Sequence, residues 1–375
     1  MKEDTLVSRR PVTLFLNFSG QGGVERMMLH LAEGLQHLYG SVEIVAVKKR
    51  SLFLQNKHLT VPLRSLGVRH TFQSLPQLAL YLRKTRPIAL LAAKDRANQV
   101  AVMARALAKT STRIVLRLGT TISAAIEHKS RLHKAAWAFP IRLLYPKADA
   151  VVAVSQGVAQ DLLNILGRPL NSLVVIPNPV ITPRLGLQAN EPLSHSWFDD
   201  PSTPVLVGMG RLTTQKDFPT LLRAFQRVRS SRPCRLILLG EGSHRRKLET
   251  LAHELGIAQD VFLAGFVTNP YPYLRKASVF VLSSLWEGSP NALTEAMALG
   301  APVVATDCPS GPREILQGGT IAPLVPMGNP DAMAAAILDM LDHPPDKERL
   351  RRAVAPYTVE NSARMYLKVL LGNDR

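Results

Sequence analysis

Two acids in the stretch WEGSPNALTEAMALG have a spacing that suits a ligand site. Glu287 lies in a Gly-Ser-Pro loop, and Glu295 follows eight positions later in a segment of helical composition. We expect this helix to begin near Asn291, a good N-cap, so that the N–H groups of Ala292 and Leu293 point back into the loop. Such a helix start attracts phosphate, and a carboxylate one turn later can reach the hydroxyls of a ribose. The alternative is a capped surface helix with incidental acids.

Two cations form a second candidate feature. In GMGRLTTQKDFPTLLRAF, Arg211 and Lys216 follow an apolar strand-like run, and Asp217 stands where it would cap the next helix. Cations on a loop at the carboxyl end of a strand are suited to a diphosphate. The alternative interpretation is a solvated basic loop.

A glycine loop forms the third feature. In FSGQGGVERMMLHLAEGL, Gly20, Gly22 and Gly23 lie between a strand and a helix, where they would let the backbone approach a phosphate. As a dinucleotide fingerprint the loop is incomplete, because Glu25 stands where a small residue should pack. The second strand is also followed by the cations 48–50 instead of an acid. An NADP-dependent oxidoreductase is therefore the least favoured alternative.

These loops belong to a regular alternation of short apolar strands and amphipathic helices. Strands that are apolar on both faces indicate parallel sheets covered by helices on both sides. In such doubly wound sheets, ligands bind outside the carboxyl ends of the strands, where the three loops fall. The expected strands lie within residues 12–18, 42–47, 88–93, 113–118, 150–155, 173–178, 204–210, 234–240, 261–265, 278–284 and 302–307.

A polar stretch rich in Pro, Ser and Asn interrupts this alternation at residues 183–203 and is predicted to be a linker. The sequence thus predicts two Rossmann-like doubly wound α/β domains that face each other, at 1–182 and 204–355. An amphipathic C-terminal helix within 356–375 is expected to pack back on the first domain.

The charge of the chain is concentrated in its first half. The chain of 375 residues has a net charge of +18, of which +16 falls on residues 1–180. This asymmetry suggests an anionic partner, either nucleic acid or an acidic membrane surface, unless it reflects only an Arg-rich composition. The absence of a recognised nucleic-acid module and an aromatic content of 6% argue against nucleic acid.

One basic stretch, residues 123–147, also has the composition of a helix that lies on a membrane. We expect it to dock on an anionic bilayer, although its apolar face could instead pack on the sheet. Its cations and large apolar residues are Lys129, Arg131, Lys134, Arg142, Lys147, Trp137, Phe139, Leu143 and Leu144.

The sequence argues for a cytoplasmic location. It contains no run of 18 apolar residues, acids precede the short apolar stretch at its start, and its only cysteines are Cys234 and Cys308. We expect a protein that is peripheral on the inner leaflet of the cytoplasmic membrane. The oligomeric state cannot be predicted.

Taken together, the motifs resemble those of the retaining glycosyltransferases of family 4. GRLTTQKDFPTLLRAF, LLGEGSHRRKLETLAHELGI, VFLAGFV and LWEGSPNALTEAMALGAPVVATD occur in the order of that family, as do GGVERMMLHLAEGL, KADAVVAVSQGV and VVIPNPV. Its E-x7-E signature falls on Glu287 and Glu295. The resemblance implies the GT-B architecture of two facing Rossmann-like domains and a nucleotide-sugar donor.

The resemblance also implies roles for individual residues. Arg211 and Lys216 would bind the diphosphate of the donor and ease departure of the nucleotide, with Glu287 as the third residue assigned to catalysis. Glu295 would hold the ribose hydroxyls. The remaining donor contacts would be the backbone of Asn291 and Ala292 at the sugar and phosphate, of Gly22 and Gly23 at the diphosphate, and of Phe266 and Val267 at the base.

Members of this family typically need no metal and no cofactor, and they retain the anomeric configuration by front-face attack with the leaving phosphate as base. The resemblance therefore implies a metal-independent, hexosyltransferase-type enzyme (EC 2.4) that takes a UDP-sugar. Its acceptor would be a glycan or lipid-linked molecule in bacterial surface polysaccharide, lipopolysaccharide or glycolipid biosynthesis. A nucleotide-sugar epimerase of the same architecture is the main alternative.

The sequence departs from the family pattern after the fourth strand of the first domain. Many members have a histidine there, whereas this chain has Arg117. We expect Arg117 and Thr120 to contact the acceptor, and His128 to be a bystander.

Overall fold

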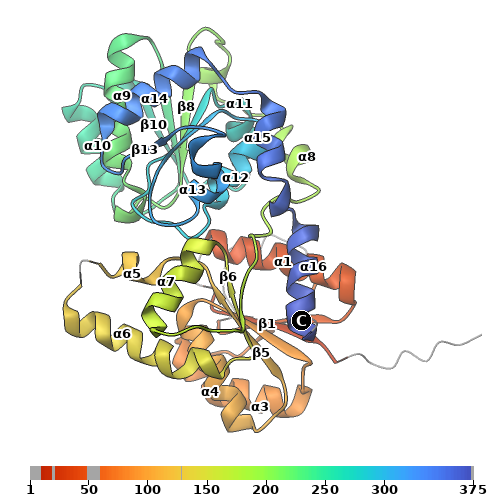
Figure 1. Ribbon diagram of the computed structural model, residues 1–375. Coiled ribbons are helices and arrows are strands. Elements are labelled where there is room, and N and C mark those ends of the chain that lie inside the picture. Colours follow the sequence, from red (N-terminus) through yellow and green to blue (C-terminus); the bar gives the residue numbers. More distant parts are fainter. Residues whose placement is uncertain (1–9, 19–21, 49–59, 128, 373–375) are drawn as a thin grey trace, which may run out of the picture. The chain divides into compact units, whose positions relative to one another are not determined.

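The computed structural model describes residues 10–18, 22–48, 60–127 and 129–372 (Figure 1). They form two compact units, each with its own sheet. Unit 1 contains the chain up to Pro179 and the segment from Val359 onward, and unit 2 contains Val180–Thr358. Of the residues discussed above, Gly20, Lys49, Arg50 and His128 lie outside the described part.

The sheet of unit 1 is parallel and has seven strands, in the order β3-β2-β1-β4-β5-β6-β7. Every residue of the central strands β1 and β4 is buried, as expected for a sheet covered on both faces. Only β3 is absent from the expected set, because its three residues are too few for a periodic signal. The strands are β1 (Val12–Leu16), β2 (Val42–Ala46), β3 (Leu63–Ser65), β4 (Ala89–Ala93), β5 (Arg113–Leu118), β6 (Ala150–Ala153) and β7 (Leu173–Val175).

Helices cover both faces of this sheet, with a separate apolar core on each side. One core contains Phe15 of β1 and buried residues of α3, α4, α6 and α7. The other contains Leu14 and Leu16 of the same strand and buried residues of α1 and α16. The helices of unit 1 are α1 (Gly23–Tyr39), α3 (Leu75–Thr85), α4 (Asp95–Ala108), α5 (Ile122–Ala125), α6 (Arg131–Leu144), α7 (Gln156–Leu166) and α16 (Val359–Leu371), with short 3₁₀ turns η1 (Thr71–Ser74) and η2 (Tyr145–Lys147).

The expected return of the C-terminal helix to the first domain is confirmed by α16, which packs against α1 (Figure 1). Gly34 of α1 makes this contact close, because a Cβ there would lie 2.9 Å from Ala363 Cβ. Hydrogen bonds hold the helix at both ends. Ser362 Oγ donates to the carbonyl of Pro177 at 2.8 Å, and Arg113 Nε donates to that of Val369 at 2.8 Å.

The sheet of unit 2 is also parallel, with six strands in the order β10-β9-β8-β11-β12-β13. Five of them match expected strands, and the two-residue β13 was missed. The strands are β8 (Val205–Met209), β9 (Arg235–Leu239), β10 (Val261–Gly265), β11 (Val279–Leu282), β12 (Val303–Thr306) and β13 (Leu324–Val325).

Helices and short turns surround this second sheet (Figure 1). The helices are α8 (Leu185–Ala189), α9 (Phe218–Ser231), α10 (Arg245–Glu254), α11 (Tyr271–Lys276), α12 (Asn291–Ala298), α13 (Pro312–Ile315), α14 (Pro330–Asp342) and α15 (Lys347–Ala353). The 3₁₀ turns are η3 (Ser196–Phe198), η4 (Thr214–Lys216), η5 (Ala258–Asp260), η6 (Gln317–Gly319) and η7 (Ala355–Tyr357).

The stretch 183–203, expected to be a linker, is instead a packed part of unit 2. It contains α8 and η3, and Leu185 and Ala189 are buried in the core of this unit. Trp197 stacks edge-on with Phe262, with ring centroids 6.2 Å apart. Scattered apolar residues without periodicity are thus sufficient to anchor a polar segment, which is why composition alone did not reveal the packing.

Candidate functional site

Three loops meet at the carboxyl edge of the sheet in unit 2, because they follow the neighbouring strands β8, β11 and β12. The N–H of Leu285 donates to the carbonyl of Gln215 at 2.8 Å, and Gln215 Nε2 donates to that of Trp286 at 2.9 Å. The N–H of Glu287 donates to the carbonyl of Pro309 at 3.1 Å. Two backbone hydrogen bonds and one from the Gln215 side chain therefore hold the loops of Lys216 and Glu287 in one fixed arrangement.

Lys216 and Glu287 form an ion pair at the centre of these loops. Lys216 Nζ lies 2.5 Å from Glu287 Oε1, and Ser284 Oγ donates to the same oxygen at 2.6 Å. The two charged side chains are only 16% and 9% exposed. A largely buried pair of this kind stays ordered, so the cation and the carboxylate are held in fixed positions.

Gly210 determines how Lys216 lies. A Cβ at position 210 would stand 2.7 Å from Lys216 Cε and 3.0 Å from its Cδ. The aliphatic part of the lysine therefore runs directly over the glycine, and this close approach directs Nζ toward Glu287.

The loop of Glu287 packs against the segment that follows β12. Gly311 has φ +91°, and a Cβ there would lie 2.6 Å from Pro290 Cδ. Ser310 Oγ donates to the carbonyl of Gly288 at 3.1 Å. Nearby Cys308 is buried, and burial, helped by the negative charge of Glu287, raises the pKa of its thiol to about 12.

Arg211 provides a second cation at the same edge. Its side chain is exposed, and within the described ranges it forms no ion pair. The backbone beside it is fixed, because the N–H of Leu212 donates to the carbonyl of Glu241 at 3.0 Å. A Cβ at Gly242 would lie only 2.3 Å from Leu212 O, so the loops after β8 and β9 pack backbone against backbone.

Glu295 lies in the second turn of α12, as expected, and is 1% exposed. Tyr271 Oη donates to its Oε1 over a long distance of 3.4 Å. Sequence reasoning missed Tyr271, since no motif distinguishes it from the neighbouring Tyr273. Phe266, 41% exposed, and Val267 lie in the loop between β10 and α11, which also leads to Tyr271.

The expected cap of α12 is wrong by one residue. Pro290 occupies the N-cap position without a side-chain bond, and Asn291 is the first helical residue. The N–H groups of Leu293 and Thr294 donate to the carbonyl of Pro290 at 3.1 and 3.2 Å. Proline has no side-chain acceptor, and both of these N–H groups are bonded to its backbone carbonyl instead. The N–H of Leu293 is therefore not directed into the loop, contrary to the prediction from the sequence. Ala292 follows Asn291 in the first turn.

In unit 1, Gly22 and Gly23 lie at the start of α1, with Gly22 in the N-cap position. Among the residues that the structure describes, none would lie within 4 Å of a Cβ at Gly22. Thr120 is exposed in the loop after β5.

The expected acceptor contact of Arg117 conflicts with its burial. Arg117 lies within β5, is 2% exposed, and donates from Nη2 to Asn178 Oδ1 at 2.7 Å. It is two residues after Val115 and so points to the same face of the sheet, toward Tyr366 of α16. Burial lowers the pKa of its guanidinium. Arg117 therefore supports the core of unit 1.

A second ion pair, between Lys94 and Glu25, lies at the carboxyl edge of the sheet in unit 1. Lys94 Nζ lies 2.9 Å from Glu25 Oε1 and donates to the carbonyl of Asn17 at 2.8 Å. Lys94 has φ +79°, a conformation that L-residues rarely adopt and that often occurs at functional sites. No sequence motif marks Lys94, and Glu25 stands out in the sequence only as a departure from the dinucleotide fingerprint.

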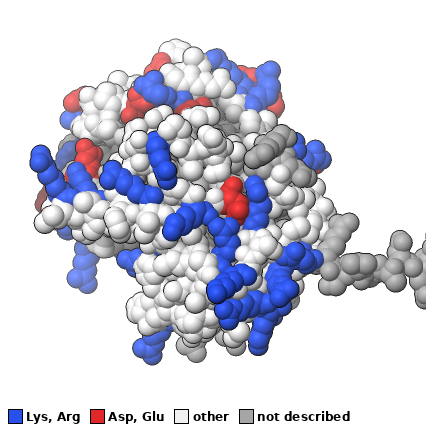
Figure 2. Space-filling view, turned by 60° about the horizontal axis from the view of Figure 1, so that its bottom comes forward, with Lys and Arg blue, Asp and Glu red and all other residues white. Residues whose placement is uncertain are grey.

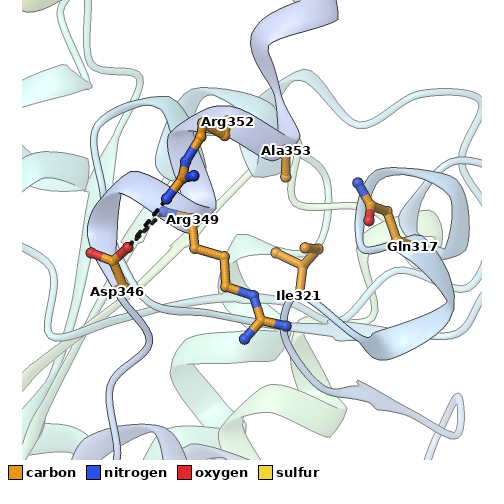
Figure 3. Close-up of a pocket in the computed structure, with 6 residues that line it drawn as sticks. All are labelled: Gln317, Ile321, Asp346, Arg349, Arg352 and Ala353. Atoms are coloured by element: carbon orange, nitrogen blue, oxygen red, sulfur yellow. Dashed lines mark hydrogen bonds and ion pairs between the residues drawn. The ribbon is translucent and has the colours of Figure 1, made fainter.

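A shallow cavity of about 440 Å³ in unit 2 contains none of these residues (Figure 3). Its two arginines already have partners, because Arg352 pairs with Asp346 at 3.8 Å and Arg349 Nη2 donates to the carbonyl of Thr320 at 2.5 Å. The cavity therefore shares no lining residue with the candidate site. It is lined by Gln317, Ile321, Asp346, Arg349, Arg352 and Ala353.

The part of the chain that the structure describes lacks a metal-binding cluster and a membrane-spanning helix. It has no group of three or more His, Cys, Asp and Glu residues placed to hold a metal ion. None of its helices combines the length and the apolar character needed to cross a membrane.

The edge in unit 2 thus combines an exposed cation, an ordered lysine–glutamate pair and a buried carboxylate on a helix. Cations are suited to phosphate oxygens, and carboxylates are suited to hydroxyl groups. The arrangement is appropriate for a ligand that carries both, such as a sugar nucleotide.

Comparison with known proteins gives two family matches. The family described as "Glycosyltransferase Family 4" matches residues 21–184, and "Glycosyl transferases group 1" matches residues 203–343. The chain is 29% identical to the N-acetylgalactosamine-N,N'-diacetylbacillosaminyl-diphospho-undecaprenol 4-alpha-N-acetylgalactosaminyltransferase of Campylobacter jejuni, over 96% of this chain and 97% of that protein. It is 28% identical to the lipopolysaccharide core biosynthesis glycosyltransferase LpsE of Rhizobium meliloti, over 86% of each chain.

A solved structure shares the fold. HepE of Anabaena, determined in complex with UDP-glucose, matches with a TM-score of 0.77 and 17% identity, over 96% of this chain and 99% of that chain. The two parallel-sheet units are therefore those of a GT-B protein, as the sequence predicted. Because the two family descriptions match residues in both units, the chain belongs to the group 1, family 4 glycosyltransferases.

Proposed function

We propose that this glycosyltransferase moves a sugar from a UDP-sugar to a lipid-linked or glycan acceptor, with retention of anomeric configuration. The observation that carries the proposal is the Lys216–Glu287 pair, held at 2.5 Å beside the exposed Arg211 on one edge of the sheet. The pair supplies a fixed cation for the diphosphate, and a carboxylate that can accept hydrogen bonds from the sugar.

In this proposal the two cations offset the charge that develops on the leaving diphosphate. Lys216 and Arg211 take over the role that a divalent ion has in other transferases, so we expect no need for a metal or cofactor. As the bond from the sugar C1 to the phosphate oxygen breaks, the acceptor oxygen bonds to C1 on the same face. The acceptor proton passes to the leaving phosphate oxygen, so no side chain has to act as nucleophile.

Glu295 is assigned to the ribose. Its carboxylate is almost fully buried in α12 and accepts a hydrogen bond from the hydroxyl of Tyr271 at 3.4 Å, which orients it. A carboxylate accepts several hydrogen bonds, so a ribose hydroxyl can bind to Glu295 alongside Tyr271. The backbone after β10, at the exposed Phe266 and the half-buried Val267, is proposed to meet the base.

The proposed acceptor class is supported by the relatives. The Campylobacter relative is named for transfer to a diphospho-undecaprenol-linked sugar, and the Rhizobium relative for lipopolysaccharide core biosynthesis. We therefore propose a role in surface polysaccharide or glycolipid assembly.

The donor site is tested first by a thermal-shift panel of UDP, GDP and ADP. A ligand that binds only the folded protein raises the melting temperature according to its concentration relative to its Kd. We expect a shift with UDP that persists in EDTA and is lost in Glu295→Ala. The matched control is Glu254→Ala, at the end of α10, which should keep the shift. A shift that Glu295→Ala preserves would overturn the ribose assignment, and one that requires a metal would overturn metal independence.

A further inference from the structure

Helix α6 of unit 1 has apolar residues on two opposite faces. Its inner face packs on the core through Ile141, which is fully buried, and through the half-buried Trp137 and Leu144. At about 100° per residue, Leu132, Phe139 and Leu143 fall in a stripe roughly opposite Ile141. The alternative that its apolar residues simply pack on the sheet therefore accounts for only one of the two faces.

The outer stripe is unusually exposed. Leu132 is 85% exposed, Phe139 is 68% exposed and Leu143 is 49% exposed, and the small Ala135 and Ala136 between them are exposed as well. Single exposed apolar residues are common on protein surfaces, but a continuous stripe along one helix marks a contact surface.

Positive charge flanks this stripe at both ends of the helix. Lys129 and Arg131 are exposed at the start of α6, and Arg142 and Lys147 are exposed at its end. Figure 2 turns the bottom of the view in Figure 1, where unit 1 is drawn, toward the reader. Many Lys and Arg side chains and few acids are visible on this part of unit 1. The partner of the stripe must therefore combine apolar groups with negative charge.

The apolar stripe and its flanking cations together exclude some of the possible partners. A nucleic acid has the charge, but it offers no apolar layer for Leu132 and Phe139. A second copy of this chain would bring one strongly basic surface against another, which like charges oppose. An anionic lipid bilayer has negative headgroups directly above an apolar layer, so it satisfies both requirements.

We propose that α6 lies in the interface of an anionic membrane, with Leu132, Phe139 and Leu143 among the acyl chains and the flanking cations at the headgroups. The inference deepens the proposed function, because an enzyme docked in this way reaches a lipid-linked acceptor where that acceptor resides. Vesicles that contain no acceptor test it independently of catalysis.

The test is co-sedimentation of the full chain with phosphatidylcholine vesicles that contain phosphatidylglycerol, compared with phosphatidylcholine alone. We expect binding to the anionic vesicles that weakens as salt increases. Leu132→Gln combined with Phe139→Gln should lower the partition coefficient by about tenfold or more, because each side chain loses much of its transfer free energy. The matched control is Leu187→Gln, at a leucine of α8 that is 73% exposed, and it should bind like wild type.

A second pair of variants tests the charges. Lys129→Gln combined with Arg131→Gln should weaken anionic binding by about thirtyfold, since each basic residue near an anionic surface contributes about 1 kcal/mol. Arg246→Gln combined with Lys247→Gln, on the exposed side of α10, removes the same charge elsewhere and should have a much smaller effect.

Several outcomes would overturn the proposal. They are equal binding to neutral vesicles, no loss in the Leu132/Phe139 variant, and an equal loss in the Leu187 control. Loss of a dimer in the Leu132/Phe139 variant on size-exclusion chromatography would assign the stripe to a second copy instead. If vesicle binding fails while UDP still stabilises the protein, the docking surface is wrong and the proposed function stands.

Discussion

The substitution Gly210→Ala offers a sharp test of the donor site, because it moves a functional side chain without touching it chemically. The new Cβ would lie 2.7 Å from Lys216 Cε, whereas ordinary contacts begin at 3.4 Å. Cε would therefore have to move by about 0.7 Å or more, and Nζ would move with it, away from its 2.5 Å contact with Glu287. Displacements of about 1 Å in a positioned group can reduce rates about 100-fold.

The expected loss falls on ligand binding and activity, not on folding. Gly210 does not have a positive φ, so the backbone accepts alanine, and the flexible lysine yields before the strand does. A charge-assisted hydrogen bond contributes about 1.5–3 kcal/mol, so the Kd for the nucleoside diphosphate should rise about tenfold to 100-fold. The melting temperature without ligand should change by only about 2–4 °C, as expected for a change of about 1 kcal/mol.

Isothermal titration calorimetry with the stabilising nucleoside diphosphate measures this effect without an acceptor. The matched control is Gly186→Ala in α8, where a Cβ would meet nothing within 4 Å and φ is not positive. This control should bind the nucleotide like wild type. Unchanged affinity in Gly210→Ala would refute the assigned role of Lys216, and an equal loss in Gly186→Ala would show that the effect is not local.

Three further predictions concern other residues. Tyr271→Phe removes the hydroxyl that reaches Glu295, so nucleotide affinity should fall about three- to tenfold while the fold remains stable; calorimetry would contradict this if Kd were unchanged. Arg117→Ala removes a buried side chain and its bond to Asn178, so scanning calorimetry should show a melting temperature about 5–10 °C lower with nucleotide affinity intact. Burial raises the thiol pKa of Cys234 to about 11 and of Cys308 to about 12, so at pH 8 at most about one thiol in 10³ is ionised and iodoacetamide should label neither until the chain unfolds.

Much of the fold could be predicted because its signals are local. Strand β1 and the start of α1 follow each other within a few residues, and apolar runs and helical periodicity identify both. The same applies to the loops of Arg211 and Glu287, since parallel sheets place ligand loops after their strands. Short or aperiodic segments escaped, as β13 and the packed stretch 183–203 show, because two residues or scattered apolar side chains form no recognisable period.

The candidate site could be predicted only in part. Residue type and position after a strand identified Arg211 and Lys216, but not the support of Lys216 by Gly210. Tyr271 and Lys94 carried no motif, so nothing in the chain marked them. Arg117 was expected at the acceptor, whereas the structure buries its side chain beside Asn178. A local pattern does not distinguish a buried strand residue from an exposed one.

Local sequence patterns establish the order of strands and helices along the chain, and therefore which residues follow which strand. Which of these residues meet depends on how the strands are arranged in the folded sheets. Lys216 and Glu287 are 71 positions apart, and Lys94 and Glu25 are 69 apart. Each pair forms because the order of strands in the sheet brings distant loops to one edge. That order depends on long-range packing of buried strands, which no local pattern records.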